Sequence, residues 1–420
     1  MLSITFPAHA QFSGGNGSAD NPYIITTAQQ LAQLATFVND GNSDYRSAYY
    51  KLGNDIDLSA YQSGTGWTPI GHDLSFYGKF DGNNKKITGL YINNPTLRYV
   101  GLFGIISGAT VKNLAVENVN ITGKNGVGSV VGTAYFNATN TITNCYSTGK
   151  VSGSGNEIGG IVGYFYGNLT NCYSTCEVSG NETVGGVAGI VSGSLKNCYS
   201  TGKVSGEKRI GGVSNSAYVG SNNISNCAAL NPSVKGTNSD AGRIGIDGSV
   251  EGYAWLSLSN NAAYDGLVNN SGNTVWNNKG ADKEDGEDIT LQQIQSDGTI
   301  GGRFTAADGW TTENGKLPGL FGNTVPMPAH LGGVGIVETR LIASLQVYPN
   351  PTTGELTIEI SDMRYEISDI EIYDVFGRKQ ISNLKSQISN PIDVSHLPSG
   401  IYFIRITTEN GVITKKVIKN

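Results

Sequence analysis

The segment Asn144-Cys145-Tyr146-Ser147-Thr148 decides the fold of this 420-residue chain, because it returns at a regular interval. Identical copies occupy residues 171–175 and 197–201, and a degenerate copy, Asn-Cys-Ala-Ala-Leu, occupies 226–230. The four asparagines are 27, 26 and 29 residues apart. A period of about 20 to 50 residues is typical of solenoids, whose short units stack because none of them buries its apolar face alone.

The remainder of each unit also indicates β-structure. Glycine-apolar blocks such as Ile158-Gly159-Gly160-Ile161-Val162-Gly163 precede each copy, and segments such as Lys150-Val151-Ser152-Gly153 follow it. Short runs rich in Val, Ile and Thr between Gly, Asn and Ser predict about three strands per turn. We therefore predict an all-β fold that begins as a right-handed parallel β-helix, or solenoid, with about five to seven turns in residues 50–260.

An upstream unit shows which side chains face the core. There, Gly101-Leu102-Phe103-Gly104 precedes Asn113-Leu114, and Leu114 holds the position that cysteine holds in the later units. The cysteine column is therefore expected to point inward, with the serine two residues later. Strand alternation turns the intervening tyrosine outward.

The asparagine before each of these positions is expected to form a corner of the coil. Asparagine tolerates the left-handed backbone conformation and bonds to neighbouring backbone groups. Identical amides stacked at strand spacing can also bond to one another as a ladder. The column is uninterrupted through five units and consists of Asn113, Asn144, Asn171, Asn197 and Asn226.

Both ends of the solenoid need a cover. Residues 26–38 combine an N-cap threonine with apolar residues at helical spacing, which predicts an amphipathic capping helix on the first coil. The apolar positions are Leu31, Leu34, Ala35 and Val38. Residues 261–324, with Trp276 and Trp310, are expected to close the other end.

Composition limits the class of protein. The net charge is −6 and no basic run exists, which argues against a nucleic-acid groove. No apolar stretch of about 18 residues exists, so we expect no transmembrane helix. Ala8-His9-Ala10 fits a secretory cleavage site. We expect residues 1–10 to be the remnant of a signal peptide that starts further upstream; the alternative is an ordinary N-terminal tail.

Residues 341–420 change character, because glycine becomes scarce and alternating strands predict a small antiparallel β-sandwich. Residues 325–340 are expected to be the linker to it. The motifs, in order, are Val347-Tyr348-Pro349-Asn350-Pro351, Ile372-Tyr373-Asp374-Val375-Phe376-Gly377-Arg378 and Leu397-Pro398-Ser399-Gly400-Ile401-Tyr402. They resemble the C-terminal sorting domain of type IX secretion cargo in Bacteroidota. The resemblance implies that the type IX machinery exports the chain, which is then released or attached at the cell surface.

The repeats have a family likeness of their own. Gly101-Leu102-Phe103-Gly104 and the Gly-Gly-Ile-Val-Gly blocks resemble GLUG-motif proteins, which are surface β-helices of gut and oral bacteria. We assign residues 11–324 to a GLUG-type parallel β-helix with its caps.

Cysteines and aspartates leave several chemical alternatives open. We expect buried free thiols at Cys145, Cys172, Cys176, Cys198 and Cys227, with a disulfide between coils or a metal site as alternatives. Calcium binding by Asp55, Asp57, Asp73 and Asp81 is another, although aspartate beside Gly and Asn usually forms turns. The prediction is that the chain has no metal site and no cofactor.

Outward tyrosines are the candidate ligand-binding residues, because each offers an apolar ring face and a hydroxyl. One strip is predicted to contain Tyr135, Tyr164, Tyr166 and Tyr218, and a second to contain Tyr146, Tyr173 and Tyr199. The structural alternative is that these rings only stabilise the sides of the coil.

The expected function follows from these candidates. We expect a secreted or surface-attached, non-catalytic protein, adhesin-like or binding glycan or matrix. The alternative is a carbohydrate-active enzyme, a polysaccharide lyase or glycoside hydrolase, which would need acidic or basic side chains converging in one lateral groove.

Overall fold

The computed structural model describes residues 12–135, 138–216, 220–237, 241–246, 254–332, 345–360, 367–382, 384, 391–408 and 411–420. The chain divides into two compact units, Met1–Pro326 and Met327–Asn420. The expected signal remnant, residues 1–10, lies outside the described residues.

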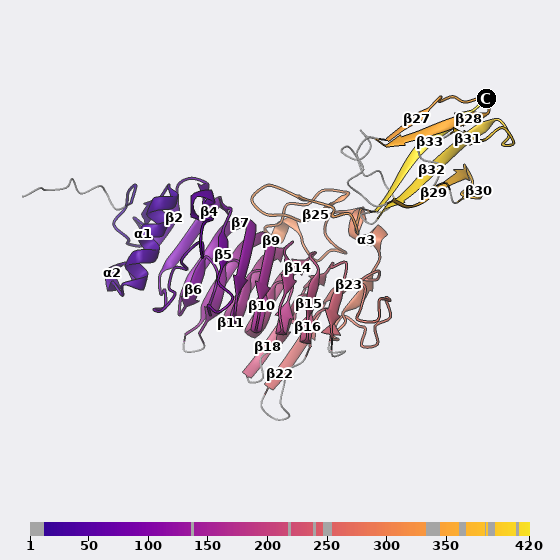
Figure 1. The fold of residues 1–420 in the computed structure, drawn as a ribbon. Helices are drawn as coiled ribbons and strands as arrows, with labels where there is room; N and C mark the ends of the chain where they lie inside the picture. Colours follow the sequence, from indigo (N-terminus) through magenta and orange to yellow (C-terminus); the bar gives the residue numbers. More distant parts are fainter. Residues whose placement is uncertain are drawn as a thin grey trace, which may run out of the picture. The chain divides into compact units, whose positions relative to one another are not determined.

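The first unit is a parallel β-solenoid of about nine turns, which confirms the predicted solenoid (Figure 1). Its turns extend on both sides of residues 50–260, the segment for which about five to seven turns were predicted. The coil already starts at β1 and continues to β24. Its earlier strands are β1 (Tyr23–Ile25), β2 (Tyr49–Leu52), β3 (Ile56–Asp57), β4 (Lys79–Thr88), β5 (Tyr91–Asn93), β6 (Phe103–Ile106), β7 (Thr110–Gly123), β8 (Val131–Ala134), β9 (Asn140–Gly153), β10 (Asn156–Gly159), β11 (Val162–Ser174) and β12 (Glu177–Ser179). Its later strands are β13 (Glu182–Gly185), β14 (Ala188–Ser200), β15 (Val204–Gly206), β16 (Lys208–Gly211), β17 (Ser214–Ser216), β18 (Gly220–Ser225), β19 (Ala228–Ala229), β20 (Val234–Gly236), β21 (Ala241–Gly242), β22 (Ala254–Ser259), β23 (Ala262–Tyr264) and β24 (Glu287–Ile289).

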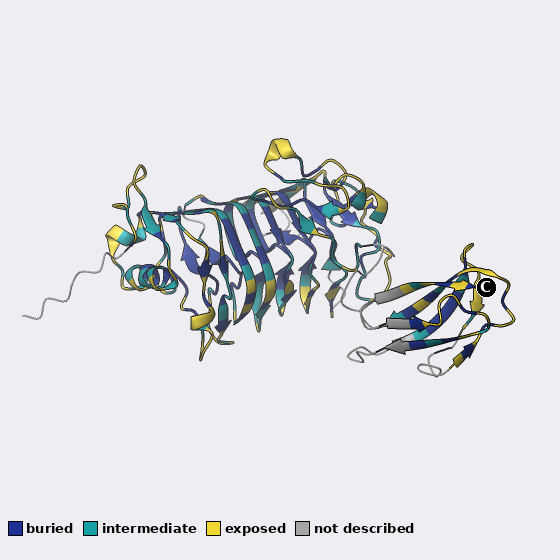
Figure 2. Ribbon diagram, turned by 90° about the horizontal axis from the view of Figure 1, so that it is seen from above, coloured by how far each residue is buried: buried dark blue, intermediate teal, exposed yellow. Residues whose placement is uncertain are grey.

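Strand register confirms the inward columns. Cys172 pairs with Cys145 on one side and with Cys198 on the other, and Leu114 pairs with Cys145. All four side chains are completely buried. Buried residues line the inside of the coil along its length (Figure 2).

The asparagine ladder (Asn113, Asn144, Asn171, Asn197 and Asn226) is present as predicted. Each of these residues has φ between 52° and 54°, the left-handed conformation that turns the chain at the corner. Each side-chain amide donates to the side-chain oxygen of the preceding coil, at 3.1, 3.2, 3.0 and 2.7 Å along the series. The ladder ends on a carboxylate, because Asn113 Nδ2 donates to Asp81 Oδ1 at 3.0 Å.

Two glycines show why the glycine-apolar blocks exclude side chains. A Cβ on Gly185 would lie 2.9 Å from the Ser214 Cα of the next turn, and one on Gly160 would lie 2.3 Å from the Gly186 carbonyl oxygen of the next turn. Backbone of one turn therefore approaches backbone of the next, and any larger residue would push the coil apart.

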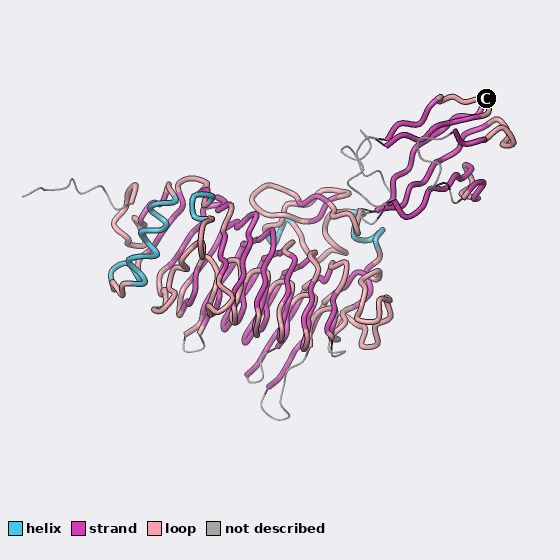
Figure 3. Tube along the Cα trace, in the orientation of Figure 1, coloured by secondary structure: helices cyan, strands magenta, loops and turns pink. Residues whose placement is uncertain are grey.

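The N-terminal cap is the predicted helix. Helix α1 (Ala28–Asn39) begins after Thr27, whose side chain accepts from the Gln30 backbone N–H, and it lies at the first coil (Figure 3). It buries Leu31, Leu34, Ala35 and Val38, which are the four positions predicted from periodicity. A short helix, α2 (Ser43–Arg46), follows it.

The C-terminal end differs from the prediction. Trp276 is buried with the core, as expected of a cap, and its indole donates to the Leu267 carbonyl at 2.9 Å. Residues 299–323, which we name the strap, instead run back along the side of the coil (Figure 1). Nearby elements are α3 (Leu291–Ser296), η2 (Ala306–Asp308) and the hairpin of β25 (Lys316–Leu317) and β26 (Val325–Pro326). Because Val325 and Pro326 pair with β25, the linker cannot begin at residue 325.

The second unit is an antiparallel sandwich of two sheets. One sheet has the order β27 (Leu345–Tyr348), β28 (Glu355–Ile360) and β31 (Pro391–Asp393). The other has the order β30 (Lys379–Ile381), β29 (Ile367–Asp374), β32 (Gly400–Thr408) and β33 (Gly411–Lys419). Ile358, Ile372 and Ile404 belong to its own buried core, which confirms the predicted sandwich.

Candidate functional site

The first candidate is the tyrosine ladder, Tyr146, Tyr173 and Tyr199. The rings stack nearly parallel, with centroids 4.7 and 5.0 Å apart and interplanar angles of 6° and 3°. They point away from the coil interior, as predicted. Tyr173 and Tyr199 are nevertheless only 5% and 0% exposed to solvent.

The strap accounts for this burial. Trp310 lies 6.2 Å from the ring centroid of Tyr173 and 5.8 Å from that of Tyr199. Tyr199 Oη donates to the Pro318 carbonyl at 2.6 Å, and Phe304 packs edge-on against the Tyr199 ring at 5.4 Å. The ligand-binding prediction is therefore wrong for Tyr173 and Tyr199, because a segment of the same chain occupies the surface that a ligand would use.

Tyr146, the third ring of the ladder, is half-buried. Its ring lies 5.8 Å from that of Phe321, and its hydroxyl donates to Glu117 Oε1 at 2.7 Å. Burial, followed by the contact with Glu117, raises the pKa of Tyr146. This hydroxyl is thus already engaged within the protein.

The second predicted strip is a compact patch on neighbouring turns. Tyr135, Tyr164 and Tyr166 are half-buried and face outward, whereas Phe165 between the latter two is completely buried. Burial raises the pKa of both Tyr135 and Tyr164. Tyr135 also packs edge-on against Tyr99 at 6.3 Å. We call Tyr99, Tyr135, Tyr164 and Tyr166 the tyrosine patch.

The strip does not continue as an unbroken row. Tyr164 pairs with Thr133 on one side and with Ile190 on the other, and Tyr166 pairs with Ser192. Tyr218, predicted to extend the row, lies outside the described residues.

A polar surface adjoins the patch. Along β11 the outward positions after Tyr166 are Asn168 and Thr170. In-register neighbours on β7, β9 and β14 complete what we name the lateral face: Thr110, Lys112, Thr141, Thr143, Asn168, Thr170, Ser194 and Lys196. These eight residues offer hydroxyl, amide and ammonium groups, and none is a carboxylate.

At its N-terminal end the lateral face opens into a cavity of about 390 Å³, which we name the lysine pocket. Lys51, Lys79 and Lys112 come from three successive turns, and Asp81 and Tyr49 lie between them. The remaining lining residues are Ala19, Pro22, Tyr50, Phe80 and Thr110. Sequence reasoning missed this pocket, although Lys51, Lys79 and Lys112 are 28 and 33 residues apart, close to the coil period.

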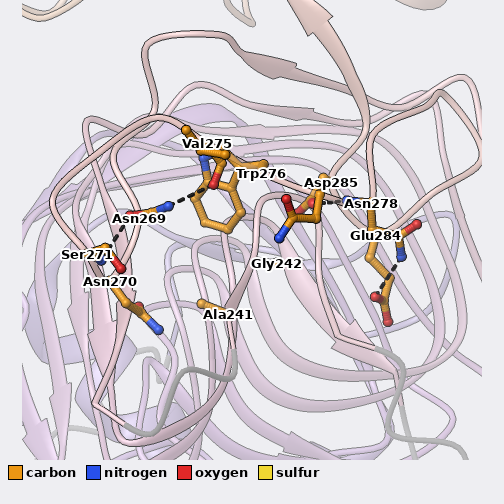
Figure 4. Close-up of a pocket in the computed structure, with 11 residues that line it drawn as sticks. Ala241, Gly242, Asn269, Asn270, Ser271, Val275, Trp276, Asn278, Glu284 and Asp285 are labelled. Atoms are coloured by element: carbon orange, nitrogen blue, oxygen red, sulfur yellow. Dashed lines mark hydrogen bonds between the residues drawn. The ribbon is translucent and has the colours of Figure 1, made fainter.

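A second cavity, of about 270 Å³, lies near the C-terminal end of the coil (Figure 4). Asp285 accepts from the backbone N–H groups of Arg243 and Asn278, at 3.1 and 2.8 Å. Asn269 accepts from the Ser271 N–H and donates to the Val275 carbonyl. The polar groups that line this cavity are thus largely engaged in hydrogen bonds that hold the surrounding loops.

The early aspartates serve as turn and corner residues. Asp57 accepts from the Ser59 N–H at 2.9 Å, and Asp55 accepts from the Lys86 N–H at 3.0 Å. Asp81 accepts from Asn113 at the end of the asparagine ladder and lies 3.4 Å from Lys112 Nζ. Across the described residues, no three His, Cys, Asp or Glu side chains are grouped closely enough to hold a metal ion.

The cysteine column contains free thiols. All five cysteines are buried and unbridged, and burial raises the pKa of Cys145, Cys172 and Cys198 well above the ordinary value. Burial also raises the pKa of Cys176 to about 11. A thiol that stays protonated and enclosed is a poor nucleophile, so the column is a packing element.

Comparison with known families identifies two segments. Residues 346–420 match the secretion system C-terminal sorting domain, and residues 180–205 match the GLUG motif. The sorting domain directs type IX secretion, so the chain is secreted or attached at the cell surface. Within the described part of the chain, no helix is both long and apolar enough to cross a membrane.

Two relatives match part of the chain. A protein named as a Gly-rich membrane protein of Evansella cellulosilytica is 39% identical over 115 residues, which are 27% of this chain and 12% of that protein. Halomucin of Haloquadratum walsbyi is 34% identical over 157 residues, which are 36% of this chain and 2% of halomucin. The chain therefore matches only a small part of either relative.

Proposed function

We propose that this chain, a GLUG-motif solenoid with a type IX secretion sorting domain, is a non-catalytic, adhesin-like surface protein. In this proposal it binds a glycan or a matrix protein through the tyrosine patch and the lateral face.

The observation that carries the proposal is the outward side of β11. Tyr164, Tyr166, Asn168 and Thr170 follow one another there at alternate positions and join the two surfaces. A tyrosine ring offers an apolar face to a sugar ring, and the hydroxyl and amide groups beside it can donate and accept hydrogen bonds. The close stacking of the turns holds these groups at fixed spacing, which lowers the entropy lost on binding.

The charges on the lateral face favour binding over hydrolysis; the carboxylate beside the tyrosine patch is Glu157, whose charge contributes, after burial, to the raised pKa of Tyr164. Glycoside hydrolysis uses two carboxyl groups about 5 to 9.5 Å apart, on either side of the scissile bond. The eight residues of the lateral face include no carboxylate. The nearest one in the adjoining pocket is Asp81, which is engaged by Asn113 and Lys112.

A glycan and matrix-protein array with the full chain tests the proposal. The test variant is Tyr164→Ala/Tyr166→Ala, which removes two half-exposed rings. The control is Tyr173→Phe, which alters a tyrosine that the strap covers. We expect the double variant to lose at least tenfold in affinity for whatever the wild type binds, and the control to bind as the wild type does.

The same array can also contradict the proposal in two ways. Equal binding by the wild type and the double variant would remove the tyrosine patch from the site. Products released from a bound polysaccharide would replace the binding function with a lyase or hydrolase activity.

A further inference from the structure

We infer that the lysine pocket binds an anionic group, a carboxylate or sulfate, on an acidic polysaccharide that lies along the lateral face. This inference rests on the proposed function and specifies its ligand class and the end at which the ligand is anchored.

Strand register places the three lysines at the corners of one small area. Lys51 and Lys112 both neighbour Asp81 in the same outward column, one turn before it and one turn after it. Lys79 projects beside them in the adjacent column, between Tyr49 and Thr110. Turns spaced about 4.8 Å apart hold these groups within reach of a single ligand group.

The charges of the pocket are not balanced by the protein. Three ammonium groups face one carboxylate, although the whole chain has a net charge of −6. Lys112 pairs with Asp81 at 3.4 Å, whereas Lys79 Nζ donates to a neutral acceptor, the Gly108 carbonyl, at 2.6 Å. Among the described residues, neither Lys51 nor Lys79 lies within ion-pair distance of a carboxylate.

Burial adds to this imbalance. Partial desolvation lowers the pKa of Lys79, in keeping with the lack of a carboxylate partner for its ammonium group among the described residues. An incoming anion would supply that compensation and stabilise the ammonium form. Ion pairs in a partly enclosed site are also screened less by salt than those on an open surface.

The walls of the pocket favour a sugar as the carrier of that anion. Tyr49 is 38% exposed, so a ring face is available beside the ammonium groups. Ala19 and Pro22 form an apolar wall. The volume of about 390 Å³ lies within the range of about 300 to 1,000 Å³ that is usual for ligand pockets.

Continuity with the lateral face favours a polymer over a free monosaccharide. Thr110 and Lys112 line the pocket and also begin the rows that continue through Thr141 and Thr143. A chain anchored by its acidic group in the pocket would therefore meet hydroxyl groups at every following turn, and Lys196 further along.

The test measures binding of the full chain to three immobilised polysaccharides: polygalacturonate, chondroitin sulfate and neutral dextran. The variants are Lys51→Gln/Lys79→Gln and the single change Lys51→Gln, which leaves the Lys79 hydrogen bond intact. The control, Lys150→Gln/Lys203→Gln, changes the net charge equally at exposed residues outside the pocket. Thermal unfolding of each variant checks that it is folded.

We expect the wild type to bind polygalacturonate, which carries only carboxylates, or chondroitin sulfate, which carries both carboxylates and sulfates. Binding to polygalacturonate shows that a carboxylate suffices, and binding to chondroitin sulfate alone shows that sulfate is required. The double variant should lose at least tenfold in affinity, the single variant at least threefold, and the control less than twofold. Affinity should also fall as the salt concentration rises.

Three results would overturn the inference, and the first two leave the proposed binding function standing. If both pocket variants bind as the control does, while Tyr164→Ala/Tyr166→Ala still abolishes binding, the pocket is excluded and the binding function stands. If the protein binds only dextran, the anionic class is wrong. If it binds no glycan and no matrix protein, both proposals fail.

Discussion

At the scale of single residues, the asparagine corner was the most predictable feature of the chain. Asn171 shows why, because its left-handed backbone and its amide bonds depend only on the residue itself and on identical residues one period away. The inward cysteines were predictable for the same reason. The lysine pocket was not predicted, because Lys51 and Lys79 belong to turns that lack the Asn-Cys-Tyr-Ser-Thr motif, so their alignment could not be read from it.

Asn171 gives the first prediction. Asn171→Ala removes two donated hydrogen bonds and one accepted hydrogen bond. It also leaves alanine at φ 54° without the side-chain hydrogen bonds that offset the backbone strain of asparagine there. The free energy of unfolding should therefore fall by about 2–4 kcal/mol. Asn171→Gly loses the same hydrogen bonds without the backbone penalty and should cost about 1 kcal/mol less. Urea titration measures both. Equal losses would show that backbone strain contributes nothing at this corner.

The buried thiols give a pH prediction. The pKa of Cys176 is raised from 9.0 to about 11 in the folded protein. Below pH 9 the thiol is protonated in both states. As the pH rises from about 9 to 11 the unfolded chain loses this proton and the folded chain keeps it, so stability falls.

The ionisation of Cys176 should lower the free energy of unfolding by about 1.4 kcal/mol per pH unit in this window. Cys176→Ala should therefore unfold with a shallower pH dependence than the wild type, while the two slopes agree below pH 8.5. Urea midpoints between pH 8 and pH 11 provide the measurement. Parallel curves through pH 11 would mean that this thiol titrates normally in the folded state.

At the scale of elements, the sequence pattern predicted the capping helix, whose apolar residues are regularly spaced. It did not predict the strap, whose aromatic residues are not. The capping helix α1 follows from the spacing of four apolar residues and an N-cap threonine. The strap does not, since Phe304, Trp310 and Phe321 have no common spacing and find their partners more than 100 residues earlier. The strap covers Tyr173 and Tyr199, which are two of the seven tyrosines predicted to bind a ligand.

The strap gives the element-scale prediction. Trp310→Ala removes a side chain that is 3% exposed and covers both Tyr173 and Tyr199, so it should destabilise the solenoid by about 3–5 kcal/mol. Phe321→Ala, which removes a half-buried ring contacting Tyr146, should cost less than half as much. Calorimetry compares the two. Similar unfolding temperatures for both variants and the wild type would show that the strap does not stabilise the coil.

At the scale of the whole molecule, the C-terminal sandwich directs export, and in the proposed function the solenoid presents the binding surface. Removal of residues 346–420 should leave the solenoid inside a host that has the type IX system, because the sorting signal is gone. Protease accessibility on intact cells and immunoblots of the medium measure this. The full-length Tyr164→Ala/Tyr166→Ala variant, whose sorting domain is intact, should be exported normally.

Affinity electrophoresis of the full chain through gels that contain embedded polysaccharides measures whether the solenoid binds an acidic glycan without cleaving it. Each gel reports both binding, as slower migration, and cleavage, as a cleared zone in the stained polysaccharide. We expect slower migration in at least one acidic polysaccharide, with no clearing. Unchanged migration in every gel, or a cleared zone along the path of the protein, would contradict it.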